Sequence, residues 1–117
     1  MPINKFDLVR LIKDGRLAWN SWRQANPYEV IDISRLDFLG LDLREYDFKD
    51  VAATAAKFEN CDLSYTDFSN AECSGASFRH ATLYAANFGR AIVNDADFSQ
   101  ADLAEWPAPG LVDTRLS

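Results

Sequence analysis

Apolar residues recur every five positions from Leu36 to Glu105, and this step is unbroken through fourteen copies. Every tenth residue is phenylalanine: Phe38, Phe48, Phe58, Phe68, Phe78, Phe88 and Phe98. The centres midway between them are Leu43, Ala53, Leu63, Cys73, Leu83, Val93 and Leu103. A second apolar or small residue stands two positions before each centre and is alanine in most later repeats.

A step of five fits neither a helix nor a straight strand. Along an α-helix it rotates by about 140° net, so the centres would spread around the cylinder. Along a strand it sends alternate centres to opposite faces. A short extended piece followed by a turn in every repeat brings all the centres into one core. The pattern therefore predicts a solenoid, in which stacked repeats bury a core that no single repeat could form.

The residue types repeat most closely at intervals of twenty, which predicts coils with four sides. The four sets are Phe38, Phe58, Phe78 and Phe98; Leu43, Leu63, Leu83 and Leu103; Phe48, Phe68 and Phe88; and the smaller Ile33, Ala53, Cys73 and Val93. Fourteen repeats make about 3.5 coils. Coils about 4.8 Å apart would let the phenylalanine rings stack, since ring centroids prefer separations of about 4.5–7 Å.

Several repeats share one motif, as in Ala86-Asn-Phe-Gly-Arg90, Ala96-Asp-Phe-Ser-Gln100 and Ala101-Asp-Leu-Ala-Glu105. This motif resembles the consensus of the pentapeptide repeat family, Ala-Asp/Asn-Leu/Phe followed by two variable residues. The resemblance covers about 60% of the chain. It implies an all-β solenoid, a right-handed four-sided β-helix with Leu, Phe and Ala pointing inward. The segment before the repeats is similar to the helical leader that caps the first coil in some members.

Residues 4–26 have helical spacing, with Asn4 as the N-cap, a break at Gly15 and an end before Pro27. Trp19 and Trp22 share a helix face and are expected to pack on the first coil, where residues two before the centres are larger than alanine. The expected divisions are a helical cap at 1–27, the β-helix at 28–105 and a tail at 106–117, all within one structural domain. Trp106 could cover the last coil or contact a second molecule.

The weakest repeat is 51–55, which lacks a large centre and an acidic residue before it. A local bulge or widened turn is an open alternative there.

The net charge of −6 is uneven, with a basic excess in residues 1–35 and a strong acidic excess in residues 36–105. An acidic body argues against direct nucleic-acid binding, because phosphate contacts need Lys and Arg. Two neighbouring columns of outward carboxylates are expected, formed by Asp42, Asp62 and Asp102 and by Asp47 and Asp67. They either stabilise the turns or form an interaction face. Tyr65, Tyr84 and Ile92 are a weaker candidate patch.

The sequence contains no recognisable catalytic constellation. His80, the only histidine, occupies an outward turn position without a second His or suitably spaced Cys. Cys61 and Cys73 fall at interior positions and are expected to be core residues in a reducing compartment. No cofactor, metal or membrane partner is expected, and the expected location is the cytoplasm.

The sequence favours a non-enzymatic module that binds another protein, or acts as a scaffold, through an acidic flank. One alternative is mimicry of DNA, since some proteins of the resembled family protect DNA gyrase with acidic rods. The short repeat region and the lack of a dimer-forming helix count against it. A second alternative is a secretion-linked effector or adaptor, and a homodimer through a coil end is also left open.

Overall fold

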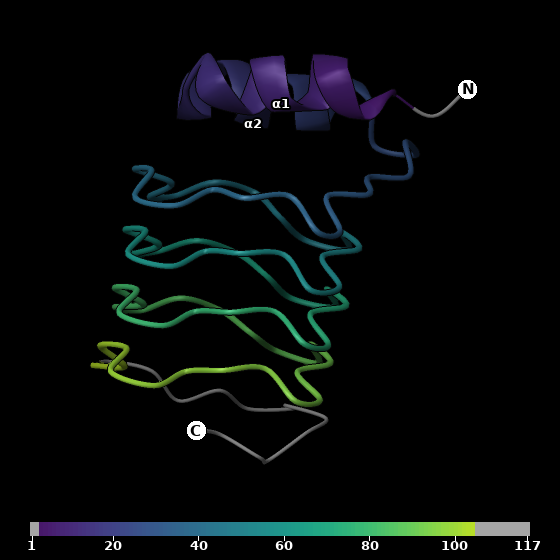
Figure 1. Ribbon diagram of the computed structural model, residues 1–117. Coiled ribbons are helices and arrows are strands. Elements are labelled where there is room, and N and C mark those ends of the chain that lie inside the picture. The colour runs from purple at the N-terminus through teal and green to yellow at the C-terminus, as the bar shows by residue number, and fades with distance from the viewer. Residues whose placement is uncertain (1–2, 105–117) are drawn as a thin grey trace.

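The computed structural model describes residues 3–104. Two α-helices lie across one end of a stack of coils, and the chain winds away from them toward the C-terminus (Figure 1). Helix α1 spans Lys5–Lys13 and helix α2 spans Arg16–Ala25. The expectations for Trp106 and for residues 106–117 lie outside the described residues.

The helices begin and end at the expected signals. The side-chain oxygen of Asn4 accepts a hydrogen bond from the Asp7 backbone N–H at 2.9 Å, which caps the first turn of α1. Gly15 separates the helices with φ 108°, a conformation that a residue with a Cβ rarely adopts. Within residues 3–104, neither helix is long and apolar enough to span a membrane.

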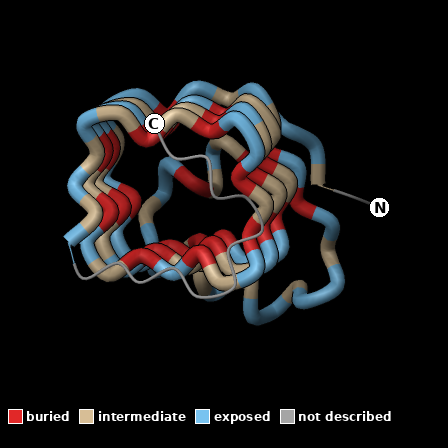
Figure 2. Tube along the Cα trace, turned by 90° about the horizontal axis from the view of Figure 1, so that it is seen from below, coloured by how far each residue is buried: buried red, intermediate tan, exposed pale blue. Residues whose placement is uncertain are grey.

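Within residues 3–104, the coils are held together by eleven isolated parallel bridges, each joining residues twenty positions apart. Each coil therefore contains four five-residue repeats, and the bridges form four columns. The expected stacking is present, but residues 3–104 contain no continuous strand. The reason is geometric, because a turn in every repeat leaves room for only one bridged residue. Figure 2 looks along the stack and shows the coils lying over one another.

We name each face after its first core residue. The Ile33 face starts with residues 31–35, the Phe38 face with 36–40, the Leu43 face with 41–45 and the Phe48 face with 46–50, and each recurs every twenty residues. The first coil begins at Ile31, one repeat before the unbroken sequence pattern. Asp32 bridges Ala52 there, and Ile31 is buried.

The same turn closes every repeat. The carbonyl oxygen of each core centre from Ile33 to Phe98 accepts a hydrogen bond from the backbone N–H three residues later, as Phe68 does from Ala71 at 3.0 Å. The residue two after each centre has a positive φ, between 55° and 73° in all repeats from Arg35 to Gln100. Only Gly40 and Gly75 are glycines at this position. Repeat 51–55 follows the same geometry, so the alternative of a bulge or widened turn there is wrong.

The core consists of stacked side chains from the four faces. On the Phe38 face the ring centroids of successive phenylalanines are 4.9–5.1 Å apart, and on the Phe48 face they are 4.9–5.4 Å apart. Rings of the two faces meet edge to face across the core, as Phe58 and Phe68 do at 5.4 Å. The residues predicted to form the core ladder are buried, except for the partly buried Leu103.

Two polar groups in the core are satisfied by main-chain carbonyls. The hydroxyl of Thr66 donates to the carbonyl oxygen of Leu43 at 2.8 Å, and the thiol of Cys61 donates to that of Phe38 at 2.9 Å. Thr66 can therefore replace alanine two positions before a centre without leaving an unpaired buried hydroxyl. Cys61 and Cys73 are free and buried, and burial raises the pKa of the Cys61 thiol to about 11.

Helix α2 covers the upper edge of the Phe48 face, which is the edge of the first coil that lies nearest the helices. Trp19 is fully buried, stacks on Trp22 at 5.7 Å and contacts Phe48 at 5.6 Å. Its indole N–H donates to the carbonyl oxygen of Asp47 at 2.7 Å. Asn20 accepts from the N–H of Asp47 at 2.9 Å. The guanidinium of Arg23 donates to the carbonyl oxygen of Lys49. Three side chains of α2 thus take the hydrogen-bonding positions that a further coil would fill.

Candidate functional site

The predicted acidic columns lie on two neighbouring faces. Parallel bridges join Asp42 to Asp62 on the Leu43 face and Asp47 to Asp67 on the Phe48 face. Asp102 continues the first column below Thr82. Because bridged residues on neighbouring coils are about 4.8 Å apart, the structure brings these outward positions together in two rows.

Each of the five aspartates stabilises its own turn. Its carboxylate accepts the backbone N–H of the residue two positions later, at distances of 2.8–3.2 Å. Asn87, which follows Asp67 in its column, makes the same bond at 2.8 Å through its amide oxygen. The turn therefore accepts a side-chain oxygen at this position but does not require a negative charge, and Ile92 stands there in a repeat that makes the same turn. The turn alone therefore does not explain why five of these residues are negatively charged.

Of the two faces that carry the predicted columns, the Leu43 face has the larger excess of negative charge. The described charged residues of this face are Asp42, Arg44, Glu45, Asp62 and Asp102. Those of the Phe48 face are more balanced, namely Asp47, Lys49, Asp50, Asp67 and Arg90. In addition, Arg23 of α2 lies 3.8 Å from the carboxylate of Asp47. We therefore define the acidic flank as Asp42, Glu45, Asp62 and Asp102, which narrows the predicted pair of columns to one face.

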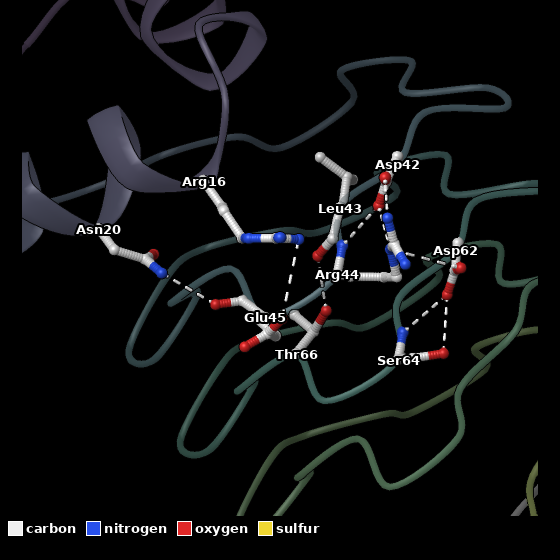
Figure 3. A network of polar contacts seen from close by, with 9 residues as sticks. All are labelled: Arg16, Asn20, Asp42, Leu43, Arg44, Glu45, Asp62, Ser64 and Thr66. Carbon is white, nitrogen blue, oxygen red and sulfur yellow. Dashed lines mark hydrogen bonds and ion pairs between the residues drawn. The ribbon is translucent and has the colours of Figure 1, made fainter.

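Arg44 organises the upper part of the acidic flank. Its Nε and Nη2 donate to the two carboxylate oxygens of Asp42 at 2.9 and 2.8 Å, and its Nε lies 3.8 Å from Asp62 (Figure 3). The hydrogen bonds from Arg44 lower the pKa of Asp42 to about 2. Asp62 also accepts from the backbone N–H and hydroxyl of Ser64, at 3.1 and 2.7 Å. The two carboxylates are therefore held in fixed orientations while remaining about half exposed.

A cleft of about 390 Å³ lies between the connection of the two helices and the first coil. Its walls are Asp14, Gly15, Arg16 and Leu17 on the cap side and Asp42, Arg44 and Tyr46 on the coil side. The Tyr46 hydroxyl donates to the carbonyl oxygen of Ile12 at 2.6 Å, which ties the coil to α1. Arg16 lies 3.7 Å from Glu45, whose carbonyl oxygen accepts from Asn20 at 2.9 Å (Figure 3).

The aromatic patch considered from the sequence is not assembled as a unit. Tyr65 and Tyr84 meet edge to face at 5.6 Å. Ile92 bridges Glu72 on the Ile33 face, across the core from the Leu43 face that carries these tyrosines, and it is half-buried. Only the tyrosine pair therefore adds to the candidate surface.

The remaining candidates for chemistry are placed as follows. His80 is exposed at a turn position with φ 58°. Within the described part of the chain, no group of three or more His, Cys, Asp or Glu side chains is arranged to hold a metal ion. The two buried thiols belong to the core.

Sequence reasoning missed the basic and amide residues of this region. Arg44 occupies a variable turn position and gave only one signal, a cation two residues after an aspartate of an acidic column. Asn20 and Arg23 lie three apart on α2, on the side that carries Trp19 toward the coil. Their hydrogen bonds depend on how the cap is seated, which the periodicity of the repeats does not specify.

The chain belongs to the pentapeptide repeat family. The sequence profile of this family, "Pentapeptide repeats", matches residues 47–83, 56–95 and 83–105 with eight copies. Pentapeptide repeat proteins fold as right-handed quadrilateral β-helices. No curated protein matches the chain.

Two solved structures resemble the fold. A pentapeptide repeat protein from the thylakoid lumen of Arabidopsis thaliana has a TM-score of 0.59 and 28% identity, over 67% of this chain and 58% of that one. A pentapeptide repeat protein from the cyanobacterium Cyanothece has a TM-score of 0.49 and 21% identity, over 68% of this chain and 58% of that one. The chain thus spans less than two thirds of either protein.

Proposed function

We propose that the chain is a non-enzymatic module that binds another protein through the acidic flank of its solenoid. The observation that carries the proposal is the charge at Asp42, Asp62 and Asp102. Their turns do not require the charge, because Asn87 makes the same hydrogen bond through an uncharged amide. Carboxylates in fixed positions favour a partner surface with Lys and Arg, which electrostatic complementarity would select and steer.

The rigidity of the flank supports this proposal. Each carboxylate is attached to a turn that is hydrogen-bonded within its repeat and between coils. A partner would therefore find the charges already ordered, and binding would cost little side-chain entropy on this side. Free thiols at Cys61 and Cys73 fit the reducing cytoplasm, which we include in the proposal as the site of action.

Photo-crosslinking tests the proposal directly. A p-benzoylphenylalanine at Tyr65, which is 59% exposed beside the acidic flank, should form a specific adduct with a partner in cells. The same residue at Tyr28, which is 96% exposed outside the coils, is the matched control. The adduct at Tyr65 should weaken in the triple variant Asp42→Asn, Asp62→Asn, Asp102→Asn, which keeps the turn acceptors.

Equal adducts at both positions, or an adduct indifferent to the triple variant, would refute the proposal. Mass spectrometry of the adduct also separates it from mimicry of DNA. If the partner were DNA gyrase and the protein altered its supercoiling activity, mimicry would replace the present interpretation. The balanced charge of the Phe48 face argues against that outcome, because duplex DNA presents phosphates all around its axis.

A further inference from the structure

The upper edge of the first coil is the part of the solenoid where stacking stops. On each face, three main-chain groups of a coil form hydrogen bonds to the preceding coil, which lies nearer the helices, as the Phe48 face shows. The N–H of Asp67 donates to Tyr46 at 3.0 Å, its carbonyl accepts from Phe48 at 2.8 Å, and the carbonyl of Ser69 accepts from Asp50 at 3.0 Å. The corresponding groups of the first coil have no coil above them. They must be paired by the cap, by water or by another molecule.

The helical cap pairs the main-chain groups of the first coil on the Phe48 face but not on the Leu43 face. On the Phe48 face, side chains of α2 pair all three groups, which belong to Asp47 and Lys49. On the Leu43 face the corresponding groups are the N–H and carbonyl of Asp42 and the carbonyl of Arg44. Within residues 3–104, none of these three has a hydrogen-bond partner in the protein. Asp42 and Arg44 are exposed, and Gly40 beside them faces open space.

This unpaired edge forms one wall of the cleft of about 390 Å³ under the helix connection. The upper edge of the Phe38 face is also unpaired within the described residues, but no wall of this cleft comes from that face. On the Leu43 face alone, an incoming chain would find one main-chain donor and two main-chain acceptors below it and Gly15, Arg16 and Leu17 above it. A parallel strand that adds to the edge of a sheet pairs with the N–H and carbonyl of one residue and with the carbonyl of the residue two positions later. Asp42 and Arg44 present these three groups.

The charges around the cleft indicate which side chains such a segment carries. Both arginines already face carboxylates, because Arg44 is hydrogen-bonded to Asp42 and Arg16 lies 3.7 Å from Glu45. Asp14 has no ion pair among the described residues, and Asp62 continues the negative charge below. The charged residues that line the cleft balance one another, and Glu45 and Asp62 beside it add an acidic excess that favours a basic occupant.

We propose that the upper edge of the Leu43 face binds an extended, Lys- or Arg-containing segment of a partner protein, which pairs with Asp42 and Arg44 as a further coil would. This inference rests on the proposed function and names where on the acidic flank the partner attaches. Leu17, which is 82% exposed at the rim, supplies an apolar contact for the aliphatic part of a basic side chain.

A phage-displayed library of random peptides about twelve residues long is the probe, selected on the full chain. Enriched peptides should carry Lys or Arg, and their addition should shift the amide NMR signals of Asp42, Arg44 and Arg16. Asp42→Pro removes the edge N–H, which makes no hydrogen bond within residues 3–104. Asp42→Ala is its matched control, because both variants lose the carboxylate and only the proline loses the N–H. The proline variant should bind at least about tenfold more weakly than the alanine variant.

A second pair of variants keeps the test valid if Asp42→Pro does not fold. Asp14→Lys places a cation at the cleft beside the C-terminus of α1, where a positive charge is compatible with the helix dipole. It should weaken peptide binding, whereas Asp50→Lys, with the same charge change outside the cleft, should not. Peptides that shift only signals around Asp62 and Asp102 would overturn the edge site and leave the acidic-flank function standing. Failure to enrich any basic peptide would also overturn the edge site, and crosslinking at Tyr65 would still decide the function.

Discussion

The indole N–H of Trp19 donates to the carbonyl oxygen of Asp47 at 2.7 Å, in the place where the next coil of a longer solenoid would donate a backbone N–H. The cap is thus more than an apolar cover. On the Phe48 face, side chains of α2 form the hydrogen bonds that the backbone of a preceding coil would form, and the stack of coils ends there.

Trp19→Phe tests this role, because it keeps an aromatic ring beside Phe48 and removes the donor. The carbonyl of Asp47 would lose its partner beneath the cap, so we expect a loss of about 1–2 kcal/mol in the free energy of unfolding. Urea denaturation of the two proteins measures it. Trp22→Phe, in the neighbouring ring, is the control and should cost less. Equal losses in the two variants would show that the indole N–H contributes nothing.

Phe68→Ala should destabilise the protein by about 3–5 kcal/mol. The ring of Phe68 is fully buried and lies between those of Phe48 and Phe88, so truncation would leave a cavity in the stack. Leu39→Ala, at a side chain 59% exposed, should change stability by no more than about 0.5 kcal/mol. A urea midpoint for Phe68→Ala that matched that of Leu39→Ala would contradict the position of Phe68 in the core.

The periodicity of the sequence was sufficient to place the core. Phe68 and Leu63 are interior because a five-residue step with a turn in each repeat brings every centre, and the residue two before it, into one core. The same geometry explains why the described coils contain no continuous strands, since the turns leave one bridged residue per repeat. The resemblance implied an all-β solenoid, and residues 3–104 pair through single bridges and not through continuous strands.

The candidate site was predicted less completely. Asp42 and Asp62 were identified as outward acidic residues because they occupy a repeat position. Arg44 was not, because its two carboxylate contacts arise from a long side chain at a variable position and from a neighbour in the next coil. The cleft likewise depends on where Arg16 comes to lie after the helices turn at Gly15. Such features depend on the docking of cap on coil, which leaves no periodic signal.

Asp42 should make stability depend on pH in acid. Its folded-state pKa of about 2 is below the ordinary value, so its ionised form favours the folded state. The contribution is present above about pH 4 and is lost as the pH falls toward the folded-state pKa of about 2. The stability difference between the wild type and Asp42→Asn should therefore shrink over that interval. An NMR titration should also show the pKa of Asp42 rising toward its ordinary value in Arg44→Gln, and an unchanged pKa would contradict the assigned cause.

Cys61 should be inert toward thiol reagents in the folded protein. Burial raises its pKa to about 11, and its thiol donates to the carbonyl of Phe38, so little thiolate exists near neutral pH. Labelling with iodoacetamide at about pH 8 should be undetectable in buffer and rapid in urea. Cys73→Ser isolates the signal of Cys61. Fast labelling of the native Cys73→Ser protein would show that this part of the core opens readily.

The most direct test of the acidic flank is the affinity of the crosslinked partner, once purified, for two charge-matched variants. One is Asp42→Asn, Asp62→Asn, Asp102→Asn on the Leu43 face. The other is Asp32→Asn, Asp37→Asn, Asp97→Asn on two other faces, where the carboxylates make the same turn hydrogen bonds. Isothermal titration calorimetry should show the Kd rising at least about tenfold in the first variant and staying near the wild-type value in the second. Equal Kd values in the two variants would contradict binding through the acidic flank.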